Sequence, residues 1–176
     1  FISNAEYLAC ESDWLRQRAD AIAAQQESKR DRSYGRRYQH PIDDEDSWSC
    51  KVSRLRETAT ETRQRINARL EAGRSCKRFT PGIDVIQQKT QLSKFERLVL
   101  LATVLLAIDQ RVVTAIESLD HVSWAAAPNS MLLLARKGFA DRIKLRSVFN
   151  PGGALFRHGL LRWSQAPPLS PDLLGE

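Results

Sequence analysis

The sequence predicts a mainly α-helical protein, in which a long helical hairpin is followed by a small helical module with a short β element. Two long stretches repeat apolar or small residues at spacings of three and four, which is the period of one face of a helix. A nearly continuous apolar run over Leu98–Ile108 indicates a buried core helix. A turn at Pro151-Gly152-Gly153 precedes a short stretch that predicts the β element. We therefore expect the hairpin over residues 1–78 and the module over residues 79–164.

The hairpin is predicted from two stripes of apolar and small side chains. The first stripe consists of Ala5, Leu8, Ser12, Leu15, Ala19 and Ile22, and the second of Trp48, Val52, Leu55, Ala59, Thr62, Ile66 and Leu70. A stretch rich in Arg, Tyr, Asp and Gly, with Pro41, separates them and predicts a loop near residues 28–46. Because many stripe positions hold Ala, Ser or Thr, the hairpin alone would bury little area at about 25 cal/mol per Å². We expect it to pack either on the downstream module or on another subunit.

The module is predicted from helix-start signals. Thr80 and Pro81 predict a helix that has Thr80 as its cap and Pro81 at its first position. Ser93 and Glu96 have the spacing of a capping box, which starts the core helix. We expect further helices over Arg111–Leu119, Met131–Lys137 and Arg142–Val148, and an extended piece over Ala154–Trp163. Three helices followed by a small β element are the order typical of a winged-helix-like unit.

The overall composition indicates a protein with a mixed, moderately basic surface. The chain has 27 Lys and Arg against 21 Asp and Glu, a formal net charge of +6. The apolar run is shorter than the roughly 20 residues that span a bilayer, so we expect no membrane segment. Three widely spaced cysteines, Cys10, Cys50 and Cys76, favour reduced thiols and therefore a cytoplasmic location.

One group of basic residues in the last third of the chain is the candidate binding site for an anion or an acidic partner. Phosphate contacts need several Lys or Arg on one face, and only Asp141 offsets this group. Its members are Arg136, Lys137, Arg142, Lys144, Arg146, Arg157 and Arg162. The group is compatible with a nucleic-acid backbone, with an acidic protein partner, or with a solvated surface.

The sequence contains no pattern that is typical of an active site. Neither the phosphate loop G-x-x-x-x-G-K-[ST] nor G-x-G-x-x-G is present. His158 has no carboxylate or nucleophile beside it in the sequence, and the histidines and cysteines lack the spacing of metal ligands. We therefore expect no catalytic residue, no cofactor and no metal site in this segment.

Three pieces of the module together resemble a known family. They are the helix start Leu92-Ser93-x-Phe95-Glu96-Arg97-x-Val99-Leu100-Leu101, the helix from Pro128 to Leu134, and Arg157-His158-Gly159-Leu160-Leu161-Arg162. In this order they resemble the amino-terminal, winged-helix-like region of a group of bacterial AAA+ ATPases, some of which are encoded with extracellular contractile injection systems. The resemblance covers about residues 90 to 164. The stretches after Asp109 and after Asp120 differ from the family pattern.

The resemblance implies a non-catalytic amino-terminal domain that recognises a substrate or partner protein and contributes to hexamer assembly. It also implies that the full-length protein uses ATP and magnesium, and that residues 165–176 form a linker toward a missing downstream domain. The start at Phe1 fits the same expectation of a fragment. Two other functions remain open: a winged-helix domain that binds nucleic acid, and a structural helical adaptor that dimerises through its hairpin.

Overall fold

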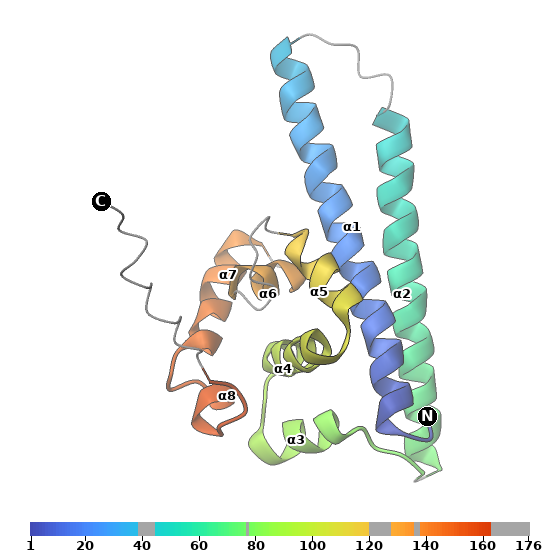
Figure 1. Cartoon of the computed structure of the whole chain (residues 1–176), viewed down its shortest axis with the longest axis vertical. Helices are drawn as coiled ribbons and strands as arrows, with labels where there is room; N and C mark the ends of the chain where they lie inside the picture. Colours follow the sequence, from blue (N-terminus) through green and yellow to red (C-terminus); the bar gives the residue numbers. More distant parts are fainter. Residues whose placement is uncertain (39–44, 77, 120–127, 136–137, 163–176) are drawn as a thin grey trace, which may run out of the picture.

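The protein is a stack of helices built around one long helical hairpin (Figure 1). The computed structural model describes residues 1–38, 45–76, 78–119, 128–135 and 138–162. The helices are α1 (Asn4–Tyr38), α2 (Glu45–Ser75), α3 (Gly82–Thr90), α4 (Lys94–Ile108), α5 (Gln110–Glu117), α6 (Pro128–Leu134), α7 (Phe139–Leu145), the 3₁₀ helix η1 (Arg146–Phe149) and α8 (Ala154–Arg157). The mainly helical fold is confirmed for these residues. The expected linker over 165–176 lies outside them.

The two hairpin helices are longer than the sequence predicts. The loop expected near residues 28–46 is wrong for its outer parts, because α1 continues to Tyr38 and α2 begins at Glu45. The polar composition of this stretch suggested a loop, but Arg and Lys are good helix formers and a single glycine only weakens a helix. The remainder, residues 39–44 with Pro41, lies outside the described residues.

Helix α1 is the centre of the fold. It packs along α2 on one side and against α4, α5 and α6 on the other, and Figure 1 shows it between α2 and the module. The two stripes supply buried residues such as Leu15, Ala19 and Ile66, which belong to the same hydrophobic core as Leu101 and Ile116 of the module. Of the two partners left open for the hairpin, the downstream module therefore covers it.

Helix α4 has the start that the sequence predicts. The Ser93 hydroxyl accepts from the Glu96 amide at 3.2 Å, and the Glu96 carboxylate accepts from the Ser93 amide at 2.8 Å, so the capping box is confirmed. Asp109 then ends α4 and caps α5, where its side chain accepts from the Arg111 amide. Among the described helices none alone is long and apolar enough to cross a bilayer, and α4 and α5 meet that test only as a pair bent by 120°.

The short β element is absent from the described part of the module. The extended piece expected over Ala154–Trp163 is wrong as far as Arg162, because helix α8 forms at Ala154–Arg157. The buried side chain of Leu155 anchors this turn in the core, and its carbonyl accepts from the amides of Leu160 and Leu161. Apolar residues in a short run fit a buried helical turn as well as a strand, and here the burial of Leu155 favours the turn.

Helices α6 and α7 lie close to their expected positions but have different ends. Helix α6 ends at Leu134, and not at Lys137 as predicted, and its final carbonyl accepts from Arg18 of α1 at 2.6 and 2.8 Å. Such a contact satisfies a carbonyl that has no partner within its helix, so α1 caps α6. The last expected helix, over Arg142–Val148, forms as α7 followed by η1.

Candidate binding cleft

A large open cavity lies where the lower half of the hairpin meets α3 and α4. Its volume is about 970 Å³, within the range typical of ligand pockets. The charged lining residues are Arg18, Arg63, Arg74, Lys94 and Arg97 on the positive side and Glu71 and Asp84 on the negative side, and the uncharged ones are Trp14, Asn67, Leu70, Ser75, Gln87 and Leu98. We call this cavity the hairpin cleft. Its excess of positive charge favours an anionic ligand.

A buried carboxylate beneath the cleft fixes two of its arginines. Glu11 is fully buried and accepts a hydrogen bond of 2.5 Å from the Tyr7 hydroxyl and one of 2.6 Å from Nη1 of Arg63. Nη2 of Arg97 donates to the Tyr7 oxygen at 2.6 Å and lies 3.9 Å from the Glu11 carboxylate. A buried charge is tolerated when it is paired and hydrogen-bonded, and Glu11 meets both conditions.

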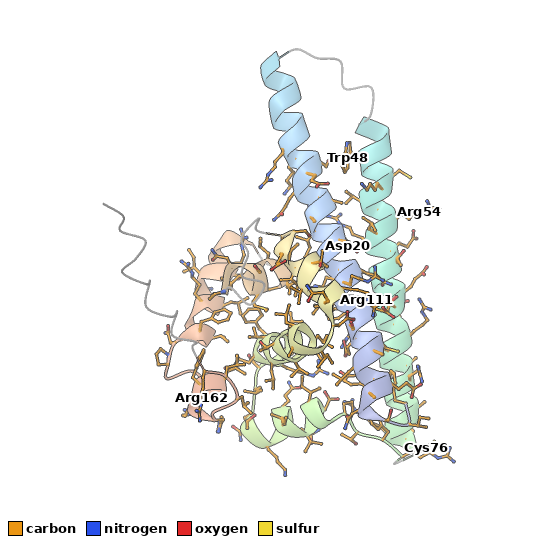
Figure 2. The ribbon with its side chains drawn as sticks, in the orientation of Figure 1. Asp20, Trp48, Arg54, Cys76, Arg111 and Arg162 are labelled. Atoms are coloured by element: carbon orange, nitrogen blue, oxygen red, sulfur yellow. The ribbon has the colours of Figure 1, made fainter. Side chains whose placement is uncertain are left out.

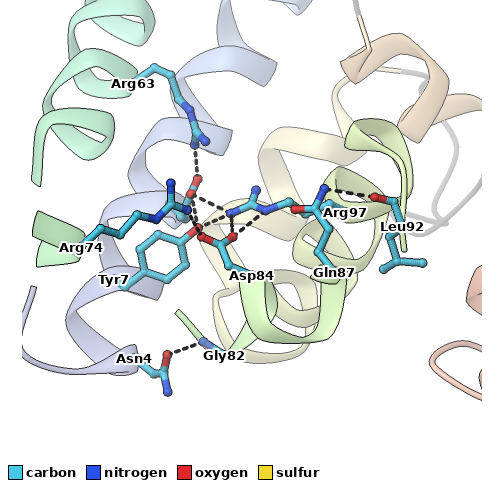
Figure 3. A network of polar contacts seen from close by, with 10 residues as sticks. Asn4, Tyr7, Arg63, Arg74, Gly82, Asp84, Gln87, Leu92 and Arg97 are labelled. Carbon is cyan, nitrogen blue, oxygen red and sulfur yellow. Dashed lines mark hydrogen bonds and ion pairs between the residues drawn. The ribbon is translucent and has the colours of Figure 1, made fainter. Parts of the chain in front are cut away.

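A second buried carboxylate, Asp84 of α3, joins the hairpin to α4. Its Oδ1 accepts from Nε of Arg97 at 2.9 Å and forms an ion pair with Nη2 of the same arginine at 2.8 Å, and its Oδ2 accepts from Nη2 of Arg74 at 2.8 Å. Figure 3 shows the side chains of Arg74 and Arg97 reaching Asp84 from opposite sides. Arginine's planar fork suits such two-point contacts with a carboxylate. Asp84 therefore determines where both guanidinium groups lie in the cleft.

Local structure explains why Asp84 lies at this point. Asp84 is in the first turn of α3, where the unpaired amides of the helix favour a negative charge. The start of α3 differs from the prediction, because Pro81 takes the cap position and Gly82 is the first helical residue. Thr80 does not cap it; instead the side chain of Asn4 in α1 accepts from the Gly82 amide at 3.0 Å (Figure 3). The first turn of α1 thus helps to position α3.

The aromatic wall of the cleft is Trp14, which is almost fully buried. The guanidinium carbon of Arg63 lies 4.6 Å from the centre of its ring system, and that of Arg18 lies 5.3 Å from it. Both distances are within the range of cation–π attraction. Leu70 and Leu98 add apolar surface to the same lining. The cleft therefore offers apolar area beside fixed positive charge.

The protonation of Tyr7 keeps this network in one arrangement. Burial raises the pKa of the Tyr7 phenol well above its usual value of about 10, and the neighbouring Glu11 carboxylate raises it further. The hydroxyl therefore keeps its proton at neutral pH and donates it to Glu11. Its oxygen remains available to accept from Arg97.

The described members of the predicted basic group lie in two kinds of environment. Arg142 is half-buried and lines a separate cavity with α1 and α2 residues, whereas Arg157 is exposed on α8. Lys144, Arg146 and Arg162 are also exposed, and Arg162 is labelled beside α8 in Figure 2. Arg136 and Lys137 lie outside the described residues.

Sequence reasoning missed most of the hairpin cleft. Arg63 and Arg74 belong to a basic series on the second long helix that has the alternating charge pattern of an exposed face. One signal was available: Glu11 lies between the stripe residues Leu8 and Leu15, so it had to be buried on the same face and needed a cation. Its partners come from 52 and 86 residues further along the chain, a pairing that local spacing cannot predict.

The other side chains considered for chemistry, the histidines and cysteines, belong to no cluster of metal ligands in the described residues. No group of three or more His, Cys, Asp or Glu side chains is placed there to hold a metal ion. Cys50 and Cys76 are exposed and Cys10 is half-buried, all as free thiols. His158 is exposed, and its amide donates to the Ala154 carbonyl at the end of α8.

The fold is a helical domain with a cleft whose charged lining residues are mainly cations, and a comparison with protein families shows to which family the chain belongs. The chain matches the family model described as "Winged helix domain, variant" over residues 1–176, so it belongs to that family. Searches of curated proteins and of solved structures found no match. The winged-helix part of the sequence prediction is thereby confirmed.

Proposed function

We propose that this chain is a non-catalytic recognition domain that binds an acidic segment of a protein partner in the hairpin cleft. The observation that carries the proposal is the lining of that cleft, in which five cations stand against two carboxylates beside Trp14 and two leucines. An acidic segment with an apolar side chain complements both features. Electrostatic complementarity of this kind mainly provides specificity and fast association.

The arginines of the cleft are held in place before any ligand binds. Arg63 is held by Glu11 and Trp14, and Arg97 by Asp84 and Tyr7. A binding site whose side chains are already ordered loses less conformational freedom on association. This favours a specific recognition site over a generally basic surface.

We further propose that the domain is the amino-terminal region of a bacterial AAA+ ATPase that acts in the cytoplasm. This rests on the resemblance of Leu92–Leu101, Pro128–Leu134 and Arg157–Arg162 to such proteins. The full-length protein would then use ATP and magnesium to remodel the captured partner, as a hexamer, and would belong with a contractile injection system. The coding sequence after Glu176 tests this: a G-x-x-x-x-G-K-[ST] motif after a predicted strand supports it, and a stop codon contradicts it.

Binding is tested by fluorescence anisotropy with a labelled peptide of repeating Glu-Glu-Leu. We expect saturable binding that Arg74→Gln and Lys94→Gln each weaken about tenfold, since a hydrogen bond to a charged group contributes about 1.5–3 kcal/mol. The matched control is Arg54→Gln, because Arg54 is exposed on α2 and does not line the cleft (Figure 2). Equal affinity in all four proteins would contradict the assignment of the cleft.

The second candidate function is nucleic-acid binding, and the exposed cations of α7, η1 and α8 favour it. Lys144, Arg146, Arg157 and Arg162 are all exposed. If they contact phosphates, affinity for a 20-base-pair duplex falls with log salt at a slope of about −0.9 per phosphate neutralised. Arg146→Gln and Arg157→Gln would each reduce that slope, whereas Arg74→Gln would not. Absent or salt-insensitive binding excludes this function.

A further inference from the structure

A second cavity, separate from the hairpin cleft, is lined by three cations from three helices. It has a volume of about 570 Å³ and lies where α1, α2, α6 and α7 residues meet. Its lining consists of Lys29, Arg56 and Arg142, the amide side chains of Gln25 and Gln26, and the apolar side chains of Ile22 and Leu133. We call it the three-cation pocket. None of its described lining residues is a carboxylate.

The two arginines of this pocket lack partners for buried donors. Nε of Arg56 and Nε of Arg142 are buried and, within the described part of the chain, donate to no acceptor. An unsatisfied buried donor costs about 1–3 kcal/mol, and more when it belongs to a charged group. Native proteins rarely leave such groups unpaired unless a ligand, water or ion completes them.

Three arginines of the hairpin cleft have carboxylate partners, unlike those of the three-cation pocket among the described residues. Arg63, Arg74 and Arg97 of that cleft are each paired with a carboxylate of the chain itself. Arg56 and Arg142 form no ion pair among the described residues, although they lie at one cavity with Lys29. Three like charges around a cavity repel one another, and an anion between them would remove that repulsion.

We propose that the three-cation pocket binds a small phosphate ester. A phosphate monoester carries about two negative charges and three strong acceptor oxygens, which match the three cations. Arginine pairs with phosphate through two parallel N–H donors, and both Arg56 and Arg142 line this cavity. The two glutamine amides provide neutral hydrogen bonds, and Ile22 and Leu133 provide an apolar wall for the organic part. The volume exceeds what an inorganic phosphate fills, so the ester is favoured over the free ion.

Side-chain amide signals in ¹⁵N NMR spectra of the whole chain test the proposal, because Gln25 and Gln26 line the pocket. The probes are phenyl phosphate, inorganic phosphate and benzoate at constant ionic strength. We expect saturable shifts of both amides, with phenyl phosphate binding at least threefold more tightly than inorganic phosphate and at least tenfold more tightly than benzoate. Arg56→Gln and Arg142→Gln should each raise the dissociation constant for phenyl phosphate about tenfold or more.

Matched controls separate binding from general charge. Arg54→Gln, two residues from Arg56 but exposed, and Arg146→Gln, four residues from Arg142 and exposed, should leave the dissociation constant unchanged. Because Arg56→Gln and Arg142→Gln remove repelling charges, both variants should fold with a melting temperature no lower than that of the unmutated protein. No saturable shift at 10 mM phenyl phosphate, equal binding of benzoate, or equal affinity in all five proteins would overturn the proposal.

Discussion

Replacing Asp84 by alanine tests the polar network that shapes the hairpin cleft. Asp84 is 5% exposed, and its carboxylate accepts one hydrogen bond from each of two arginines and forms a further ion-pair contact with Arg97. Removing it leaves Arg97, whose side chain is only 14% exposed, without the carboxylate that lies 2.8 Å from its Nη2. Breaking a buried ion pair by removing one member costs about 3–5 kcal/mol. Arg97 still donates to Tyr7, so we expect a cost of about 3 kcal/mol, at the lower end of this range.

The assay is urea unfolding followed by circular dichroism at 222 nm, with thermal unfolding as a second readout. For a chain of 176 residues, a loss of about 3 kcal/mol lowers the melting temperature by about 6–12 °C. The control is Arg74→Gln, which removes the exposed partner of Asp84 and should cost no more than about 1 kcal/mol. If Asp84→Ala costs less than about 1 kcal/mol, or no more than Arg74→Gln, the reasoning about this network is refuted.

Three further predictions concern caps and close approaches. Ser93→Ala should destabilise the protein by about 1 kcal/mol in urea unfolding, because it removes the capping box of α4; no measurable change would contradict the cap. Gly153→Ala should cost about 1–3 kcal/mol by the same assay, since the added Cβ would lie 2.8 Å from the backbone oxygen of Val148. Hydrogen bonds from Arg111 and Ser12 hold the pKa of Asp109 below its usual value. The charge of Asp109 therefore stabilises the fold at pH values above its unfolded pKa of about 3.9. This stabilisation is lost as the pH falls through the lower pKa of the folded state. Asp109→Asn keeps a cap for α5 but lacks that charge, so in urea titrations the stability of the variant should fall less between pH 5 and pH 2 than that of the unmutated protein. Parallel stability curves for the two proteins would refute the assignment.

Elements with strong local signals were predictable from the sequence. The capping box at Ser93 and the apolar run behind it gave the start and extent of α4, because both depend on residues within a few positions. The buried stripes of the hairpin followed from helical spacing in the same way. The polar end of α1 and the turn around Leu155 were misassigned, since helix propensity and burial each overrode the local composition.

The hairpin cleft could not be predicted because it depends on contacts far apart in the sequence. Glu11 meets Arg63 and Arg97 only after α1, α2 and α4 have packed together. A basic series along one helix has the same appearance whether its members face solvent or a buried carboxylate. The predicted group around Arg142 stays a prediction, since Arg142 lines the three-cation pocket whereas Lys144, Arg146, Arg157 and Arg162 are exposed.

Mapping an acidic peptide onto the domain by NMR tests the central claim most directly. The labelled chain would be titrated with the Glu-Glu-Leu peptide, and the indole signal of Trp14 and the Nε signals of Arg63 and Arg97 would be followed. The account predicts saturable shifts of these three signals, since all three side chains line the cleft. Shifts confined to Arg157 and Arg162, with the cleft signals unchanged, would contradict it and place the binding surface at α8.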